Sequence, residues 1–305
     1  MSHGASASDI ARLITVSSDT GDVSIGGERF IDCLTRPKRE LIDWLYCVLH
    51  VGNPRLLDGF GQDRWDRDFE GCIRASVEDP GISIRATAHS MRCPGDTESK
   101  TFTVYDASGV MVVGEEDDPT MLNLPCFRPR LSPGFFMFVH NRPQCLQPGE
   151  SVRRYYVSAS DPKFALAVWS SAIRELVARD VEFSTKILSN RRSFPRNDAL
   201  VFYCRDAENS VPEVLQSSLQ DAPVDLFSSC SPLCASIGVH LSTASQPLID
   251  GEERSFGESR CIPIAEAILD YAITGMNFVS LLSNRFQISG IDSQDVSRNS
   301  CSSVE

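Results

Sequence analysis

The sequence predicts an α+β fold, in which an N-terminal lobe of helix and β-hairpin precedes a mixed sheet flanked by helices. Three observations predict it. Residues 38–50 carry the apolar spacing of an amphipathic helix. Residues 101–113 hold two apolar runs around a turn signal, which is typical of a β-hairpin. Residues 151–205 switch between strand-like and helix-like periods, and this order favours helices packed on a sheet.

The N-terminal elements have recognisable boundaries. We expect the helix over 38–50 to end before the Gly-Asn-Pro run at 52–54, because glycine and proline are C-terminal stop signals. In the hairpin, residues 101–105 and 110–113 flank an Asp-Ala-Ser-Gly turn. We assign residues 9–128 to the N-terminal lobe.

The second lobe, which we assign to residues 129–289, begins with strand signals. Residues 153–159 alternate like a strand, so Arg154 and Tyr156 are expected on one face. The Asp-Pro pair at 161–162 starts a helix in which apolar residues recur every fourth position.

Two further strands are predicted at 181–188 and 199–203, and a late packing helix at 263–283. The two ends of the chain, residues 1–8 and 290–305, are rich in small and polar residues. We expect both to be disordered.

Composition argues against several classes of protein. The 305 residues carry a net charge of −12, which disfavours nucleic acid as the main partner. No apolar run reaches about 18 residues, so we expect no membrane span. The N-terminus lacks a secretory-signal pattern, and the eleven cysteines are therefore expected to be reduced thiols in the cytoplasm.

Signatures of metal or cofactor binding are missing from the sequence. Cys230 and Cys234 form a pair four positions apart, but no second Cys/His pair lies near them at metal-binding spacing. The sequence contains no Walker loop, no G-x-S-x-G motif and no H-E-x-x-H motif. We therefore expect neither a metal nor an organic cofactor.

Basic residues concentrate in one segment. Residues 151–205 hold ten Lys/Arg and five Asp/Glu, so the segment carries +5 while the rest of the chain carries −17. A compact cationic site on an acidic protein favours a small anion such as a phosphoryl group. A polyanion would instead favour a broad basic face.

Five residues of this segment are candidates for one site: Arg154, Tyr156, Lys186, Arg196 and Tyr203. A lysine within an apolar strand is unfavourable unless it points into a polar cleft, although it can also protect an edge strand. The arginines can equally be surface ion pairs, and the tyrosines can be core aromatics. Residue types alone leave both interpretations open.

Four segments carry a family resemblance: Leu-Ile-Asp-Trp-Leu-Tyr at 41–46, Leu-Ser-Pro-Gly-Phe-Phe at 131–136, the block 153–203, and Ser-Phe-Gly-Glu-Ser-Arg at 255–260. In this order they resemble the Hop-A type III effector family. Its actinobacterial relatives are lyase components of ribosomal-peptide pathways, including class V lanthipeptide and thioamitide pathways. The block also resembles phosphothreonine lyases of pathogens and the lyase domains of class III and IV lanthipeptide synthetases. The resemblance implies a phosphothreonine-lyase-like sheet in the second lobe.

The resemblance also implies a role for each candidate. Lys186 falls on the catalytic base, Arg196 on the phosphate-binding arginine and Tyr203 on a tyrosine of the site. Arg154 takes the place of a lysine. An arginine keeps a hydrogen-bond donor to phosphate, and its planar guanidinium can bind two phosphate oxygens at once. Tyr156 takes the place of the histidine that usually serves as general acid.

Two assignments therefore stay open. The general acid is either Tyr156 or a histidine, and His140 and His240 follow apolar strand-like runs from which either could reach the site. Arg260 is a further candidate for binding phosphate or a leader peptide, with a local structural role as the alternative.

The function implied is that of a phosphoserine/phosphothreonine lyase. It would eliminate phosphate from a phosphorylated precursor peptide, giving dehydroalanine or dehydrobutyrine in lanthipeptide-type biosynthesis. A separate kinase-like protein would add the phosphate, because nothing in this sequence is suited to hold ATP. The rival interpretations are a non-catalytic, effector-like protein-binding module and a leader-peptide-binding scaffold.

Overall fold

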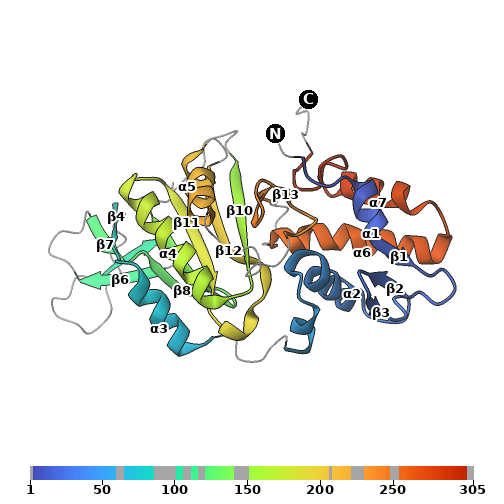
Figure 1. Ribbon diagram of the computed structural model, residues 1–305, viewed down its shortest axis with the longest axis horizontal. Coiled ribbons are helices and arrows are strands. Elements are labelled where there is room, and N and C mark those ends of the chain that lie inside the picture. The colour runs from blue at the N-terminus through green and yellow to red at the C-terminus, as the bar shows by residue number, and fades with distance from the viewer. Residues whose placement is uncertain are drawn as a thin grey trace.

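The computed structural model describes residues 3–59, 65–85, 101–105, 111–115, 121–140, 151–205, 208–220, 230–247 and 254–300 (Figure 1). The first half forms α1 (Ala7–Leu13), β1 (Ile14–Val16), β2 (Val23–Ile25), β3 (Glu28–Phe30), α2 (Lys38–Leu45), η1 (Tyr46–Val51), η2 (Pro54–Gly59), α3 (Arg67–Ser76), β4 (Ile82–Arg85), β5 (Thr101–Tyr105), β6 (Met111–Glu115), β7 (Met121–Leu124), β8 (Phe127–Ser132) and β9 (Phe135–His140). The second half forms β10 (Val152–Ala159), α4 (Pro162–Ala178), β11 (Phe183–Leu188), η3 (Arg191–Ser193), β12 (Arg196–Arg205), α5 (Ser210–Leu219), β13 (Ala235–Ser236), β14 (Leu241–Ser245), α6 (Phe256–Thr274) and α7 (Phe278–Ile288).

The predicted α+β class is confirmed. A seven-stranded sheet has the order β13-β14-β10-β12-β11-β9-β8, and β1, β2 and β3 form a small separate sheet. Every neighbouring pair in the large sheet is antiparallel, so this sheet is not mixed as expected. The reason is that β12 lies between β10 and β11, and the two strands joined through α4 never pair with each other.

Most predicted elements form where their signals lie. The side chain of Asp161 accepts a hydrogen bond from the Phe164 backbone and caps α4, as the Asp-Pro pair predicts. The helix predicted over 38–50 is α2 continued by a π-helical turn, η1, and it ends at Gly52 in the left-handed conformation. The strands of the predicted hairpin are β5 and β6, and their turn lies outside the described residues.

The single late helix expected over 263–283 is wrong, because two helices occupy this stretch. Gly275 adopts a positive φ and ends α6, and the Asn277 side chain caps the start of α7. The apolar spacing continues through the turn, so periodicity alone does not reveal it.

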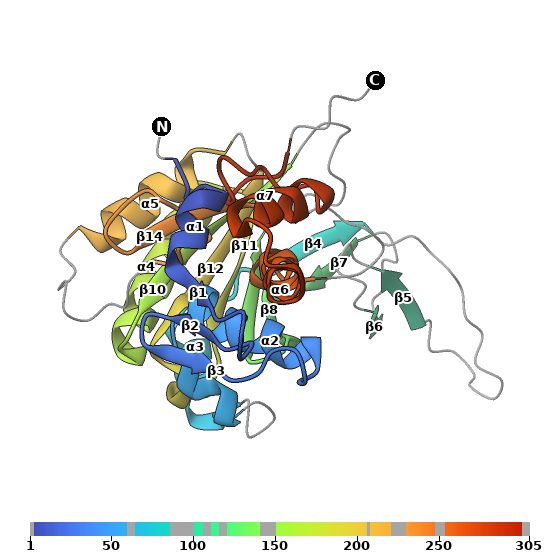
Figure 2. The same ribbon diagram turned by 90° about the vertical axis from the view of Figure 1, so that its right-hand side faces the viewer.

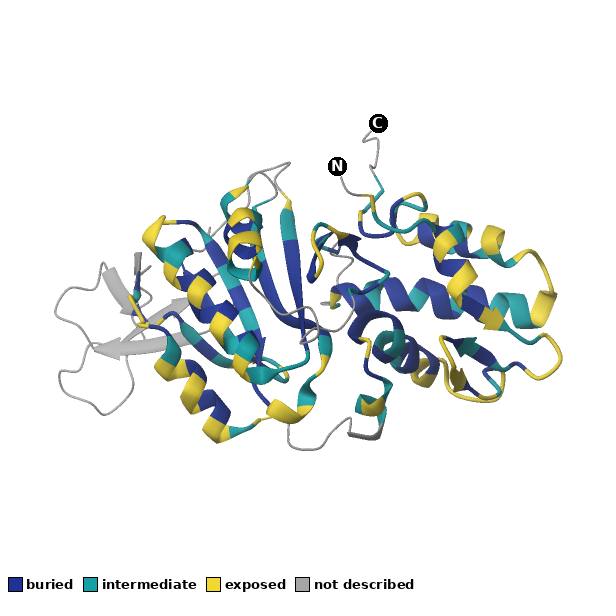
Figure 3. Ribbon diagram, in the orientation of Figure 1, coloured by how far each residue is buried: buried dark blue, intermediate teal, exposed yellow. Residues whose placement is uncertain are grey.

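Two hydrophobic clusters lie on opposite faces of the large sheet. One face packs against α4, whose sheet-facing side is buried and whose outer side is exposed (Figure 3). The other face packs against a cluster that joins α1, α2 and η1 to α6 and α7 (Figure 2). The N-terminal segment therefore shares its hydrophobic core with the C-terminal helices. A division of the chain into two lobes at residue 128 does not describe this shared core.

Both chain ends pack against each other where the structure describes them. Ser6 and Asp9 form a capping box at α1, and the backbone N–H of Ala7 donates to Ser293. Val296 is fully buried, and Ile291 pairs with Asn299 in a β-bridge. The expected disorder is therefore wrong for residues 6–8 and 290–300, because the two segments satisfy backbone groups through hydrogen bonds to each other. Residues 1–2 and 301–305 lie outside the described residues.

Candidate functional site

Strand register brings four of the predicted site residues onto one face of the large sheet. Arg154 pairs with Tyr203, and both Tyr156 and Lys186 pair with Val201, which lies between them on β12. Paired residues of antiparallel strands point to the same side of a sheet. This face looks toward η1 and α6, and it is the side on which Tyr156 and Val201 join the second hydrophobic cluster.

Lys186 is held by the turn between β8 and β9. Its Nζ donates a hydrogen bond to Ser132 Oγ at 3.3 Å and lies 4.1 Å from the centre of the Phe135 ring. The Tyr203 ring centre lies 6.0 Å away on the neighbouring strand. Gly134 adopts a positive φ between Ser132 and Phe135, which makes this turn possible. The Ser-Pro-Gly-Phe motif therefore supplies two of the side chains that contact Lys186.

Arg154 is fixed from two sides. Its guanidinium lies 5.2 Å from the centre of the Tyr203 ring, and its Nε donates to Gln246 Oε1 at 2.7 Å. Only 8% of the residue is exposed. A buried arginine with an oriented fork is suited to a planar or tetrahedral anion.

Arg196 also reaches the site, but it carries a partner of its own. Its Nε and Nη2 donate to the two carboxylate oxygens of Asp198, each at 2.7 Å, and its guanidinium lies 5.3 Å from the Phe135 ring centre. Burial raises the pKa of Asp198, but the charge and the hydrogen bonds of Arg196, with smaller contributions from His50 and Lys186, together outweigh burial and hold that pKa at about 2. Asp198 is therefore ionised. Lys186 and Arg196 lie over the same aromatic ring.

Tyr156 is buried beside the Arg154 guanidinium. Its hydroxyl has no hydrogen-bond partner of good geometry among the described residues. Burial raises the pKa of Tyr156 well above its ordinary value of 10, and this outweighs the lowering effect of Arg154. A phenol in this state is a poor proton donor at neutral pH, which disfavours Tyr156 as the general acid.

Of the histidines, the structure places His50 next to Tyr156, and the sequence interpretation missed it. The two rings meet edge to face, with centres 5.4 Å apart. His50 Nε2 lies 3.8 Å from Asp198 Oδ2, and burial lowers the pKa of His50 to about 4, so the ring is neutral. The sequence does hold one signal for His50. It lies four residues after Tyr46, the last residue of the first family segment, and residues four apart lie on the same face of a helix.

The histidines proposed from the sequence lie elsewhere. His140 pairs with Phe183, on the α4 side of the sheet, and its Nδ1 lies 3.0 Å from the Val181 carbonyl oxygen. His240 precedes β14, where its backbone carbonyl accepts from Ser158.

The segment at 255–260 supports the site from α6. Phe256 packs against His50, with ring centres 5.6 Å apart, and against Tyr156 at 5.9 Å. A Cβ on Gly257 would lie 2.3 Å from His50 Cδ2, so only glycine leaves room for this ring. Three of the family segments therefore meet around His50 and Tyr156, and the fourth holds Lys186.

Arg260 is held by hydrogen bonds to the C-terminal segment. It is 1% exposed, and its guanidinium donates to the carbonyl oxygens of Val296 and Arg298 and to Asn299 Oδ1. Burial lowers the pKa of Arg260 to about 10. These contacts tie the C-terminal segment to α6 and favour the structural alternative, whereas binding of phosphate or a leader peptide by Arg260 stays a prediction.

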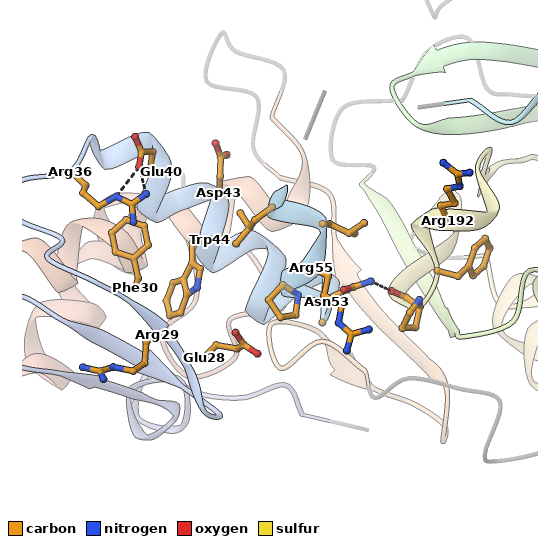
Figure 4. A pocket seen from close by; sticks show the side chains of 16 residues that line it. Glu28, Arg29, Phe30, Arg36, Glu40, Asp43, Trp44, Asn53, Arg55 and Arg192 are labelled. Atoms are coloured by element: carbon orange, nitrogen blue, oxygen red, sulfur yellow. Dashed lines mark hydrogen bonds and ion pairs between the residues drawn. The ribbon is translucent and has the colours of Figure 1, made fainter. Parts of the chain in front are cut away.

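A groove of about 1250 Å³ is lined by residues of β3, α2, η2 and the segment that precedes β12 (Figure 4). Arg55 and Arg192 line it together with Trp44. Its wall includes the hydrogen bond from Asn53 Nδ2 to the Pro195 carbonyl oxygen, at 3.0 Å. Because Arg196 follows Pro195 directly, the groove borders the candidate site.

Comparison with known proteins identifies the family. A family model described as the HopA1 effector protein family matches residues 126–298, more than half of the chain. The chain belongs to this family, and the resemblance seen in the sequence is confirmed at that level.

Two solved structures from Pseudomonas syringae are similar to the chain. They are the effector protein from pv. tomato strain DC3000, at 21% identity and a TM-score of 0.41, and the effector protein from pv. syringae strain 61, at 17% identity and a TM-score of 0.42. Each match covers 54% of this chain and 63% of the other, less than two thirds of its length. No curated protein matches the chain.

Two further observations concern the described part of the chain alone. None of its helices combines the length and the apolar character needed to cross a membrane. None of its His, Cys, Asp and Glu side chains gather in a group of three that could hold a metal ion.

Proposed function

We propose that this protein is a phosphoserine/phosphothreonine lyase that acts on a phosphorylated precursor peptide. One observation carries the proposal: Lys186, Arg154 and Arg196, from three adjacent strands, gather around the rings of Phe135 and Tyr203 in an otherwise acidic chain. β-Elimination of phosphate requires a base and groups that stabilise the departing phosphate, and a lysine beside two arginine guanidinium groups provides both.

The reaction follows from these positions. Lys186 acts as the general base and takes the Cα proton of the phosphorylated residue onto Nζ. The electron pair of the Cα–H bond forms the Cα=Cβ double bond, the Cβ–O bond breaks, and phosphate leaves with that bond's electrons. Arg154 and Arg196 stabilise the negative charge on the departing phosphate. The products are inorganic phosphate and dehydroalanine or dehydrobutyrine.

Tyr156 and Tyr203 position groups in this scheme and do not transfer protons. The Tyr203 ring lies between the Arg154 and Lys186 side chains. The Tyr156 hydroxyl, protonated because burial raises its pKa, is available to donate a hydrogen bond to a phosphate oxygen at Arg154. A phosphate held by two arginines needs little protonation to leave.

The substrate and partner follow from the family resemblance. The peptide would be a precursor in lanthipeptide-type biosynthesis, phosphorylated by a separate kinase-like protein, and the segment next to the phosphorylated residue would lie in the groove lined by Arg55 and Arg192. No metal or organic cofactor takes part in the proposed steps. We place the reaction in the cytoplasm, because all eight cysteines in the described part of the chain are free thiols.

The family description favours one alternative. Because the matching family is described as effector proteins, the same surface could bind a protein or a leader peptide without turnover. Incubating the full chain with synthetic phosphoserine and phosphothreonine peptides separates the two. Mass spectrometry should show peptides that have lost phosphoric acid and gained a double bond. Unchanged peptides that bind, or peptides hydrolysed to serine and threonine, would contradict a lyase.

A further inference from the structure

Arg154 and Arg196, the two arginines of the candidate phosphate site, are held in different ways. Arg196 donates to both oxygens of Asp198, so a carboxylate balances its charge. The Nε of Arg154 donates instead to the side-chain amide oxygen of Gln246, at 2.7 Å. In the described part of the chain, no carboxylate pairs with Arg154. The amide therefore orients this guanidinium without offsetting its positive charge.

The backbone of Gln246 is itself fixed from two sides. Its N–H donates to the Val152 carbonyl oxygen at 2.9 Å, which continues the pairing of β14 with β10, and its carbonyl oxygen accepts from Asn299 Nδ2 at 2.7 Å. Ala244, two residues earlier, is the strand partner of Arg154. Because side chains two positions apart along a strand point to the same face, Gln246 lies on the face that carries Arg154. The fold thus holds the acceptor in one position.

The hydrogen bond at Nε leaves the outer edge of the Arg154 guanidinium, formed by Nη1 and Nη2, to other partners. Among the described residues, no carboxylate, carbonyl or amide oxygen accepts from this edge. The Tyr156 hydroxyl, beside the same guanidinium, is also buried without a partner of good geometry there. Buried polar groups are rarely left unpaired, and the two Nη atoms match two oxygens of a phosphate. One phosphate at this edge would satisfy both groups.

We propose that Gln246 is a positioning residue that holds Arg154 with an uncharged acceptor, so that the guanidinium directs its outer edge and its full positive charge at the phosphate of the substrate. This role rests on the proposed function, in which Arg154 binds that phosphate. The Nε of arginine can only donate, so the amide must present its oxygen. A glutamate has the same length and could accept the same hydrogen bond. Its negative charge, however, would compete with phosphate for Arg154.

Two substitutions separate the charge from the hydrogen bond. Gln246→Glu keeps an acceptor for Arg154 but adds a carboxylate, whereas Gln246→Met keeps the length of the side chain but removes the acceptor. Gln287→Glu adds the same charge at an exposed position of α7 and is the matched control. For each full-length protein, calorimetry gives the dissociation constant of inorganic phosphate at pH 8. Kinetics with a phosphothreonine peptide give kcat and KM, and thermal unfolding gives the stability.

Both substitutions of Gln246 should weaken phosphate binding. Gln246→Glu should weaken it about tenfold or more relative to Gln287→Glu, because the carboxylate offsets the charge of Arg154. Its unfolding temperature should stay close to that of the wild type, because Arg154 keeps an acceptor. Gln246→Met should weaken binding about tenfold, the effect of losing one hydrogen bond to a charged group. Each should raise KM by more than it lowers kcat, because the phosphate is bound both before and during elimination.

A Gln246 that only satisfies a buried arginine predicts a different pattern, in which Gln246→Glu binds phosphate as the control does. Affinity of Gln246→Glu within about twofold of Gln287→Glu, or of Gln246→Met within about twofold of the wild type, would overturn the positioning role. Gln246→Asn, whose side chain is one methylene shorter, replaces Gln246→Met if thermal unfolding shows that the latter does not fold.

The same data separate the role of Gln246 from the proposed function. A wild type that eliminates phosphate, together with Gln246 variants that bind phosphate normally, removes the positioning role and leaves the lyase in place. A wild type that binds phosphate without turnover, together with the expected losses in the variants, keeps the positioning role and removes the lyase. A wild type that neither binds phosphate nor turns over the phosphopeptide removes both.

Discussion

Acidification between pH 6.5 and 4 is expected to lower the free energy of unfolding through His50. The pKa of His50 is about 4 in the folded protein, because burial opposes the charged ring, and it returns to about 6.5 on unfolding. In this window the unfolded chain binds a proton that the folded chain does not, so stability falls as the pH falls. The difference of the two pKa values corresponds to roughly 3 kcal/mol, of which roughly 2.5 kcal/mol is lost by pH 4.5.

Urea unfolding followed by tryptophan fluorescence at pH 7.5 and 4.5 measures this loss. The matched control is His50→Gln, which removes the titrating group and leaves every other histidine and carboxyl group in place. The wild type should lose roughly 2.5 kcal/mol more than the variant over this interval. Asp198 adds nothing to the difference, because its folded-state pKa of about 2 keeps its contribution intact down to about pH 4. Equal losses in the two proteins would refute the assignment of His50 as a buried neutral ring.

Three further predictions concern single side chains of the site and its support. Arg154→Lys should lower kcat/KM for a phosphopeptide about tenfold or more, because the ammonium keeps the charge but loses the fork; unchanged turnover would contradict a bidentate role. Tyr156→Phe should reduce turnover moderately and leave the shape of the pH–rate profile unchanged, whereas loss of an alkaline limb would identify Tyr156 as the acid. Arg260→Met should destabilise the protein by about 3 kcal/mol in urea unfolding while kcat of the folded variant stays within about twofold, and a large loss of kcat in a stable variant would restore Arg260 to the site.

Sequence signals predicted the local elements of the fold well, because those signals lie within a few residues of the structure they determine. The Asp161 cap and Gly52 stop signal both act where they were expected. The late helix failed because apolar spacing persists across Gly275, where the chain turns. The order of the strands could not be predicted from the sequence, because the position of β12 between β10 and β11 depends on contacts between distant segments.

The candidate site was predictable to the extent that it depends on strand alternation. The period of two places Arg154 and Tyr156 on one face, and register then adds Lys186 and Tyr203. The family resemblance marked these residues before the structure brought them together. Their proposed roles in phosphate chemistry remain predictions.

What the sequence could not reveal is the pairing of distant groups. His50 meets Asp198 only because η1 packs across the sheet. The ion pair between Arg196 and Asp198, by contrast, joins residues only two positions apart, and the sequence already allowed it as an alternative. Arg260 illustrates the opposite failure. A buried structural arginine and a phosphate ligand look alike in sequence, and the hydrogen bonds of Arg260 to backbone and side-chain acceptors become visible only in the structure.

The most direct test of the proposed lyase compares the turnover of a phosphothreonine peptide by the wild type and by Lys186→Ala. Lys163→Ala, which removes an exposed lysine on α4, is the matched control. We expect a dehydrobutyrine product from the wild type and the control. For Lys186→Ala we expect a rate about 10²- to 10⁴-fold lower, with an unfolding free energy within about 1 kcal/mol of the wild type. Absence of the dehydrobutyrine product with wild-type protein, or its formation at an undiminished rate by Lys186→Ala, would contradict the account.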